Sequence, residues 1–253
     1  MERKKTKNMQ AIILAGGKGE RLSPFTNTCP KGMLKIDGKP ILEYQLEWLR
    51  DYGVTKVVFA CGYLSQVIKD YFGSGNQHSV KIDYSFEEEP LGRGGAIKKA
   101  WEKISGNEPI IVMNGDIYTG MNLNETIKAH KSKREKENII ATICLFPYKS
   151  PYGIVRLNES SLVGSFEEKR ALPYWVNGGI YIFENDVKKH LPDKGDHETT
   201  TFPELAKKGL MFGYKSHDYW KGIDTVKDLN EFSSDRKNST LTQEPVGVLK
   251  SEN

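Results

Sequence analysis

The sequence predicts an α/β fold in which helices cover a mostly parallel central sheet. Short, nearly continuous apolar runs at residues 10–15, 54–60 and 109–113 are typical of strands that are buried on both faces. Segments with a helical apolar period separate these runs, so the chain repeats a strand–helix–strand unit. Units of this kind form parallel sheets, and ligands bind at the edge where the strands end.

The first half of the chain alternates between strand and helix patterns. The strand at residues 10–15 stops at two glycines, as a buried strand that enters a turn does. A helix is expected after Pro40, because Leu42, Leu46 and Leu49 recur on one face. The other elements expected in this half are strands at 54–60, 80–84 and 109–113, and helices at 64–72, 97–104 and 122–133.

The second half is richer in strand patterns, and several of its strands are expected to be antiparallel. Neither an internal repeat nor a Pro- or Gly-rich linker divides the chain, so one domain over residues 9–232 is expected. Residues 233–253 are rich in polar side chains, which predicts a flexible tail. The expected strands lie at 139–146, 152–157, 162–166 and 178–183.

Composition excludes several classes of protein. The chain has 253 residues, of which 38% are hydrophobic, and its formal net charge of +4 does not call for nucleic acid or an anionic membrane as partner. No apolar run approaches the roughly 18 residues of a membrane helix, and the run at residues 11–15 is too short for a signal peptide. Three scattered cysteines form no CxxC motif, which argues against a disulfide scaffold or a cysteine zinc site. A cytoplasmic protein is therefore expected.

A glycine-rich loop follows the first strand directly. Its glycines let the backbone approach a ligand and turn N–H groups toward an anion, and Lys18 and Arg21 add positive charge. A Walker A loop would need Lys-Ser or Lys-Thr after its last glycine, and a dinucleotide fingerprint would need glycine in place of Leu22. For this loop alone, a turn that binds nothing stays open as the alternative. The loop reads Leu14-Ala15-Gly16-Gly17-Lys18-Gly19-Glu20-Arg21-Leu22.

Two further segments follow this loop closely, Pro30-Lys31-Gly32-Met33-Leu34 and Gly38-Lys39-Pro40-Ile41-Leu42. Together the three segments resemble the opening of the sugar-1-phosphate nucleotidylyltransferases, also called NDP-sugar pyrophosphorylases. That family begins with an AGGxGxRL loop, then a PK pair, then a GKP before a helix. The resemblance implies a Rossmann-like, three-layer α/β domain whose strand-rich second half is a sugar-binding insertion.

The resemblance continues along nearly the whole chain, to about residue 229. Within the family, the loop at residues 87–96 and the strand at 177–181 look closest to the mannose/heptose-1-phosphate guanylyltransferase branch. The matching segments are residues 87–96 (a nucleotide-contacting loop), Asn114-Gly115-Asp116 (a metal-carboxylate motif), Tyr152-Gly153 with residues 166–169 (a sugar-phosphate segment) and residues 177–181 (a strand that closes the sugar pocket).

The resemblance implies transfer of a nucleoside monophosphate from a nucleoside triphosphate to a sugar-1-phosphate, giving a nucleotide-sugar and pyrophosphate. Such a transfer needs alignment and charge neutralisation more than covalent help from the protein. The catalytic residues would be Arg21 and Lys31, beside the phosphates, and Asp116, which would hold Mg²⁺. Nucleotide contacts are expected from Leu14, Ala15, Gly16, Gly17, Gly19, Glu89, Pro90, Gly92 and Gly94, and sugar-phosphate contacts from Gly153, Glu168, Lys169 and Asn177.

Structural alternatives stay open for several of these residues. Gly92 and Gly94 could be ordinary helix-start glycines, and Asn177 could cap a turn. Glu168 and Lys169 fit a surface salt bridge almost as well as a sugar site.

The chain departs from the family pattern near its end. The family usually closes with Trp-x-Asp, whose aspartate is the second metal ligand, whereas this chain has Gly222 two residues after Trp220. Asp224 is expected to supply the second carboxylate from a shifted loop. Asp218 is a weaker candidate, and Asp116 with substrate phosphates alone is a third possibility.

Two function classes compete. The first is the enzyme, for which guanylyl transfer to mannose- or heptose-1-phosphate is weakly preferred over cytidylyl, uridylyl or thymidylyl transfer. This enzyme is expected to be a homo-oligomer. The second is a non-catalytic, nucleotide-sugar-binding regulatory subunit, which Gly222 motivates and which the joint presence of Arg21, Lys31 and Asp116 argues against. A nicotinamide-dependent dehydrogenase is discouraged by Leu22.

Overall fold

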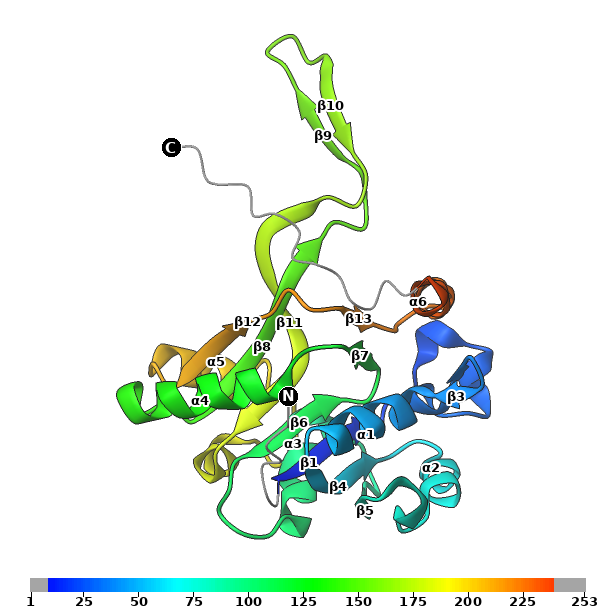
Figure 1. Ribbon diagram of the computed structural model, residues 1–253, viewed down its shortest axis with the longest axis vertical. Coiled ribbons are helices and arrows are strands. Elements are labelled where there is room, and N and C mark those ends of the chain that lie inside the picture. Colours follow the sequence, from blue (N-terminus) through cyan, green and yellow to red (C-terminus); the bar gives the residue numbers. More distant parts are fainter. Residues whose placement is uncertain (1–8, 239–253) are drawn as a thin grey trace.

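A seven-stranded sheet runs through the centre of the protein in the computed structural model, which describes residues 9–238 (Figure 1). The strand order is β12-β8-β11-β6-β1-β4-β5, and only β11 is antiparallel to its neighbours. The expected mostly parallel sheet is therefore confirmed. The strands span Met9–Ala15 (β1), Val54–Cys61 (β4), Lys81–Phe86 (β5), Ile110–Asn114 (β6), Ala141–Lys149 (β8), Ala171–Phe183 (β11) and Met211–Lys215 (β12).

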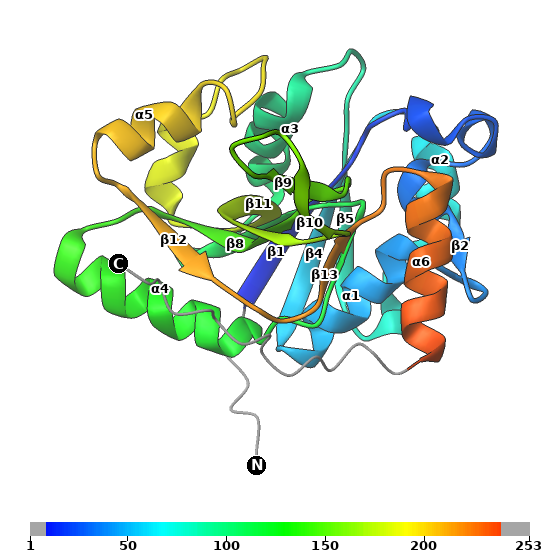
Figure 2. The same cartoon turned by 90° about the horizontal axis from the view of Figure 1, so that it is seen from above.

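Helices cover both faces of this sheet, which gives three layers (Figure 2). One core cluster packs α1, α2 and α4 against one face, and a second packs α3 and α5 against the other. The helices span Ile41–Asp51 (α1), Ser65–Phe72 (α2), Gly92–Ala100 (α3), Leu123–Glu137 (α4) and Thr201–Lys207 (α5). Short 3₁₀ helices lie at Glu20–Leu22, Phe25–Asn27, Lys31–Met33, Asn76–His78, Trp101–Lys103 and Asn185–His190.

Strand β1 shows why the central strands are continuously apolar. Side chains alternate across a strand, so Ile12 lies in the cluster with α3 and Ile13 in the cluster with α1. Both are completely buried. Because helices cover each face, neither set of positions can be polar, and the alternation of a half-exposed strand disappears.

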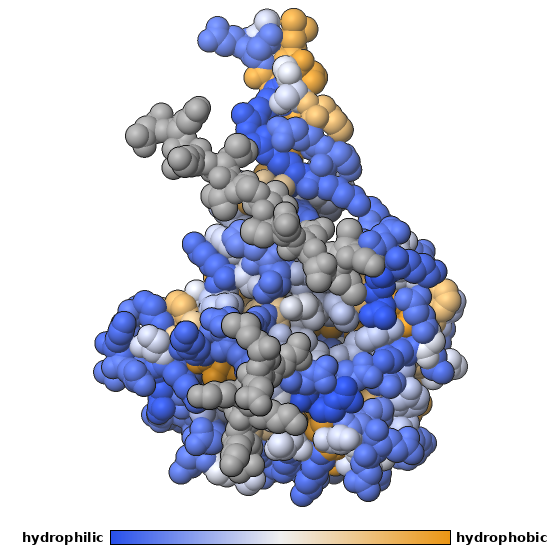
Figure 3. Space-filling view, viewed as in Figure 1, coloured by the Kyte–Doolittle hydropathy of each residue, from blue (hydrophilic) through white to orange (hydrophobic). Residues whose placement is uncertain are grey.

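A two-stranded hairpin, β9 (Ile154–Leu157) and β10 (Val163–Glu167), projects from the body of the protein (Figure 1). The flanking strands β8 and β11 belong to the central sheet, so the hairpin is the part of the strand-rich half that lies outside it. Apolar side chains gather near its end in Figure 3, where Leu157, Leu162 and Val163 are exposed, and Phe166 is exposed nearer its base. The rest of the described chain leaves this apolar surface uncovered.

The last described elements pack against the first helix. Strand β13 (Trp220–Gly222) pairs with β7 (Ile117–Thr119), and α6 spans Val226–Lys237. A separate short pair, β2 (Lys35–Ile36) with β3 (Lys39–Pro40), precedes α1. Helix α6 buries Phe232 against Tyr44 of α1. The helix continues to Lys237, so the tail does not begin at residue 233 as the sequence predicts. The remainder of the expected tail, residues 239–253, lies outside the described residues. Among the described helices, none combines the length and apolarity needed to cross a membrane.

Candidate active site

The glycine-rich loop and the Asn114-Gly115-Asp116 turn meet where two neighbouring strands end. Leu14 of β1 pairs in parallel register with Asn114 of β6, and the Gly115 N–H donates to the Leu14 carbonyl at 2.8 Å. A Cβ atom on Gly115 would lie 2.4 Å from that carbonyl oxygen, so only glycine allows this close approach. The chain therefore brings the loop and Asp116 to the same edge of the sheet.

Asp224 reaches the same place through the small ladder between β7 and β13. Gly222 pairs with Ile117, and the Ile223 N–H donates to the Asp116 carbonyl at 2.8 Å. Immediately afterwards, Thr225 and Asp228 form a capping box that starts α6. The two segments that flank Asp224 are thus both held, and its carboxylate lies beside that of Asp116.

Lys31 joins the two carboxylates. Its Nζ atom lies 2.7 Å from Oδ2 of Asp116 and 2.5 Å from Oδ1 of Asp224, and its side chain is only 13% exposed. Arg21 donates from Nη2 to the same Asp224 oxygen at 2.7 Å and is 71% exposed. Two cations and two carboxylates from four distant segments therefore form one cluster.

Asp218 lies outside this cluster. Its Oδ2 atom accepts hydrogen bonds from the Ser216 hydroxyl at 2.9 Å and from the Asn122 N–H at 3.3 Å. Of the two aspartates considered for the second carboxylate, Asp224 is the one that accompanies Asp116.

Glu87, the first residue of the predicted nucleotide-contacting loop, lies beside the glycine loop. A Cβ atom on Gly16 would be 3.0 Å from Oε1 of Glu87, and Oε2 accepts from the Leu91 N–H at 2.9 Å. The carboxylate is half-buried, and one oxygen faces the loop. Glu87 directly follows β5, so it lies at the same edge of the sheet as the glycine loop.

The remaining predicted nucleotide residues divide into two groups. Leu14, Ala15, Gly16, Gly17 and Gly19 follow one another from the end of β1 into the loop, and Gly19 packs against Lys31. Gly92 has a φ of +73°, and a Cβ there would lie 2.6 Å from the Gly195 carbonyl oxygen. Gly94 is similarly crowded by Pro192 and His197, so packing against residues 192–197 requires a small residue at both positions. Glu89 and Pro90 are exposed, and Glu89 has Lys194 at 3.8 Å.

Asn177 belongs to a polar network at the carboxyl end of β6. Its amide nitrogen donates to Tyr181 Oη and to Glu198 Oε1, both at 2.9 Å. Arg93 donates to both carboxylate oxygens of Glu198 and also pairs with Asp196. Burial alone would lower the pKa of Arg93, but the hydrogen bond with Asp196 and the charge of Glu198 raise it.

This network links the helix start predicted to contact the nucleotide with the strand predicted to contact the sugar. Gly179 packs directly against the Asn114 side chain, and the Gly94 N–H donates to the Gly195 carbonyl at 2.9 Å. Arg93 and Glu198 therefore connect the helix-start glycines to the strand of Asn177. No sequence motif marks Glu198, because its partners are distant in sequence.

The other three predicted sugar-phosphate residues lie on or next to the hairpin. Gly153 has the Phe166 ring packed against it, so a larger residue there would displace this exposed ring. Glu168 is exposed, and within residues 9–238 it forms no hydrogen bond or ion pair. Lys169 pairs with Glu231 of α6 at 3.0 Å rather than with the Lys31 cluster. Hydrogen bonds from Lys221 and Lys169 lower the pKa of Glu231 to about 2.

The oxygen donors of the cluster suit a hard cation. Asp116 and Asp224 already share one cation, the Lys31 ammonium group, and both remain partly exposed. The described residues contain no group of three or more His, Cys, Asp and Glu side chains that could hold a metal. Two carboxylates without a complete protein cage fit Mg²⁺, which keeps waters and takes phosphate oxygens as further ligands.

Comparison with known proteins identifies the family of the chain. Residues 10–239 match the family model for nucleotidyl transferases. The chain is 38% identical to a D-glycero-alpha-D-manno-heptose 1-phosphate guanylyltransferase of Aneurinibacillus thermoaerophilus, over 87% of this chain and 95% of that protein. It is 33% identical to a UTP–glucose-1-phosphate uridylyltransferase of Synechocystis, over 87% of this chain but only 61% of that longer protein.

A solved structure has the same fold. The crystal structure of HddC from Yersinia pseudotuberculosis complexed with GMP-PN superposes with a TM-score of 0.71 and 29% identity, covering 90% of this chain and 99% of HddC. The family model covers nearly the whole described chain, and the relatives and the fold belong to the same class of enzyme. The chain belongs to the nucleotidyl transferase family.

Proposed function

We propose that the protein transfers a nucleoside monophosphate from a nucleoside triphosphate to a sugar-1-phosphate. The observation that carries this proposal is the Lys31 ammonium group between the carboxylates of Asp116 and Asp224, with Arg21 on the adjoining glycine loop. In the reaction, an oxygen of the sugar phosphate attacks the α-phosphorus. The bond from that phosphorus to the β-phosphate oxygen breaks, and pyrophosphate leaves.

The cations of the cluster match the charge that this step must accommodate. Two polyanions must approach each other, so positive groups are needed where they meet. Lys31, held on both sides, would be a fixed cation beside the α-phosphate and the sugar phosphate. Arg21 is more exposed and would stabilise the negative charge of the leaving pyrophosphate.

Asp116 and Asp224 would hold Mg²⁺, together with substrate phosphate oxygens. When bound, the ion neutralises phosphate charge and polarises the phosphorus under attack. The two aspartates keep their carboxylates together through the Ile223–Asp116 backbone bond and through Lys31.

The preferred substrates in this proposal are GTP and heptose- or mannose-1-phosphate. The names of the relatives include different bases, so family membership alone does not select guanine. Three observations support it: the position of Glu87, the heptose-1-phosphate guanylyltransferase relative, and the GMP-PN complex of HddC. Guanine presents two N–H donors side by side, for which a carboxylate is the matching acceptor. Asn177 and Glu198 would contact the sugar. The other residues expected to contact the sugar phosphate are Gly153, Glu168 and Lys169, and those expected to contact the nucleotide are Leu14, Ala15, Gly16, Gly17, Gly19, Glu89, Pro90, Gly92 and Gly94.

Two wider properties complete the proposal. All three cysteines are free thiols, which suits a reducing compartment such as the cytoplasm. The exposed apolar hairpin supports a homo-oligomer. A regulatory, binding-only subunit is the competing function, but such a protein needs no cation cluster at the α-phosphate.

Pyrophosphate release tests the proposal. The protein would be incubated with Mg²⁺, five nucleoside triphosphates and a panel of sugar-1-phosphates. We expect release that needs both substrates and is fastest with GTP and a heptose or mannose phosphate. Nucleotide binding without release from any pair would favour the regulatory function.

A further inference from the structure

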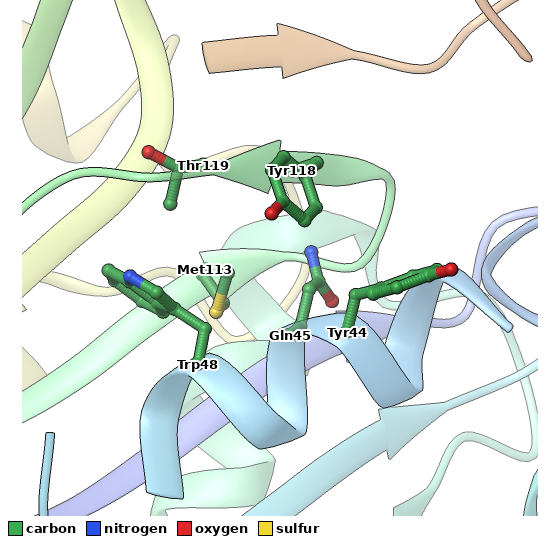
Figure 4. Close-up of a pocket in the computed structure, with 6 residues that line it drawn as sticks. All are labelled: Tyr44, Gln45, Trp48, Met113, Tyr118 and Thr119. Atoms are coloured by element: carbon green, nitrogen blue, oxygen red, sulfur yellow. The ribbon is translucent and has the colours of Figure 1, made fainter. Parts of the chain in front are cut away.

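Gln45 is a buried amide that touches both ends of the turn carrying Asp116. It lies on α1 and is only 2% exposed. Its Nε2 atom donates to the carbonyl oxygens of Asn114 and Ile117, both at 2.8 Å. Figure 4 shows the side chain reaching from α1 toward the strand that carries Tyr118 and Thr119.

The chemistry of the two acceptors requires an amide at this position. Both are carbonyl oxygens, so the group that faces them must donate two hydrogen bonds, which an amide NH₂ can do and a carboxylate cannot. The other amide atom, Oε1, is buried and has no hydrogen-bond partner within the described residues. The side chain is therefore placed for its two donor bonds, at the cost of an unsatisfied acceptor.

Four hydrogen bonds fix the turn, and they come from three different parts of the chain. The Gly115 N–H binds the end of β1, the Ile223 N–H binds the Asp116 carbonyl, and Gln45 binds the residues on both sides of Gly115-Asp116. Within residues 9–238, the two Gln45 bonds are the only hydrogen bonds between this turn and helix α1. Without them the two carbonyls would lose their donors, and the Asp116 carboxylate would be less firmly held near Lys31.

We propose that Gln45 is a positioning residue that holds Asp116 in its reactive place. This inference rests on the proposed function, because the reaction is its readout. A shift of about 1 Å at such a centre can cost roughly 100-fold in rate. Gln45 acts through the backbone of the turn and touches no substrate.

The test compares two substitutions on the same helix. Gln45→Met keeps the volume and removes the donors. Trp48→Phe is the matched control, because Trp48 lies one turn further along α1 and donates from Nε1 to the Met121 carbonyl at 3.1 Å, away from Asp116. Gln45→Met loses two hydrogen bonds from α1 that flank Asp116, whereas Trp48→Phe loses one from the same helix that does not.

We expect Gln45→Met to lower kcat about 10- to 100-fold with little change in KM, while Trp48→Phe stays within about twofold of the wild type. Independently of activity, amide hydrogen exchange at Gly115 and Ile223 should become faster in Gln45→Met and not in Trp48→Phe. If Gln45→Met does not fold, Gln45→Asn, which is too short to reach both carbonyls, should show the same pattern.

Equal kcat and equal exchange in the two variants would overturn the inference. An inactive wild type would instead count against the proposed function, and the exchange measurement would still decide whether Gln45 holds the turn. Faster exchange at both amides with unchanged kcat would show a structural bond only, and would also overturn the positioning role.

Discussion

The Nζ atom of Lys31 lies 2.5 Å from Oδ1 of Asp224, although 193 residues separate the two in sequence. The same nitrogen lies 2.7 Å from Asp116. The side chain of Lys31 is largely buried, whereas both carboxylates are partly exposed on one side. The cluster is therefore anchored from the protein interior and accessible from the solvent, as the proposed reaction requires.

Arg21 offers the simplest test of charge neutralisation. Because its side chain is 71% exposed, Arg21→Ala should leave the melting temperature nearly unchanged. We expect kcat to fall about 100- to 1,000-fold, since one donor to the transferring phosphates is lost. Arg50→Ala, which removes a partly exposed arginine that pairs with its neighbour Asp51, is the control. Steady-state kinetics that show near-normal turnover for Arg21→Ala would remove this residue from the mechanism.

The two aspartates should differ from Asp218 in their effect on magnesium. Asp116→Asn should abolish Mg²⁺-dependent turnover, and Asp224→Asn should raise the half-saturating Mg²⁺ concentration about tenfold or more, because each loses a charged oxygen donor. Asp218→Asn should leave the magnesium dependence unchanged, since Asp218 binds Ser216 and Asn122 instead. Magnesium titrations of all three variants provide the comparison. A shift for Asp218→Asn and none for Asp224→Asn would reverse our assignment.

Glu87 should set the preference for the base. Glu87→Gln keeps the side-chain shape and can still accept from the Leu91 N–H, but it replaces the acceptor near Gly16 by a donor. We expect kcat/KM for GTP to fall about tenfold relative to UTP. Competition assays with both nucleotides measure this ratio directly. The same ratio in variant and wild type would show that Glu87 does not face the base.

His197 should make the fold sensitive to acid. It is completely buried, neither ring nitrogen has a hydrogen-bond partner within the described residues, and burial lowers its pKa to about 4 from an ordinary 6.5. Between these values the unfolded chain binds a proton that the folded chain does not. Stability is therefore highest above pH 6.5 and falls, by about 3 kcal/mol, as the pH drops to 4.

Calorimetry between pH 7.5 and 4 tests this prediction against His197→Leu. The variant lacks the titrating group, so its melting temperature should fall less steeply over this range. Parallel curves for the two proteins would mean that other groups cause the acid sensitivity.

The sequence predicts the central strands well because their burial is local information. In β1, every position faces a helix layer, so the apolar run itself marks the strand. Strands β12 and β13 were not expected. Both have only partly buried side chains, and they form through pairing with β8 and β7, which local patterns do not reveal.

The site shows the same division. Arg21, Lys31 and Asp116 stand in motifs, and the structure brings all three into one cluster. The choice between Asp218 and Asp224 stayed open, because it depends on where the chain crosses β7. Gln45 and Glu198 belong to no motif and are visible only through contacts with distant residues.

The most direct test of the account follows the phosphorus atoms of the nucleotide. The protein would be incubated with Mg²⁺, a heptose- or mannose-1-phosphate and GTP labelled at either the α- or the γ-phosphate. We predict that the α label appears in a nucleotide-sugar and the γ label in pyrophosphate, and that both need the sugar phosphate. A γ label in the sugar product, or no product with any nucleotide and sugar phosphate despite nucleotide binding, would contradict nucleotidyl transfer at the Lys31 cluster.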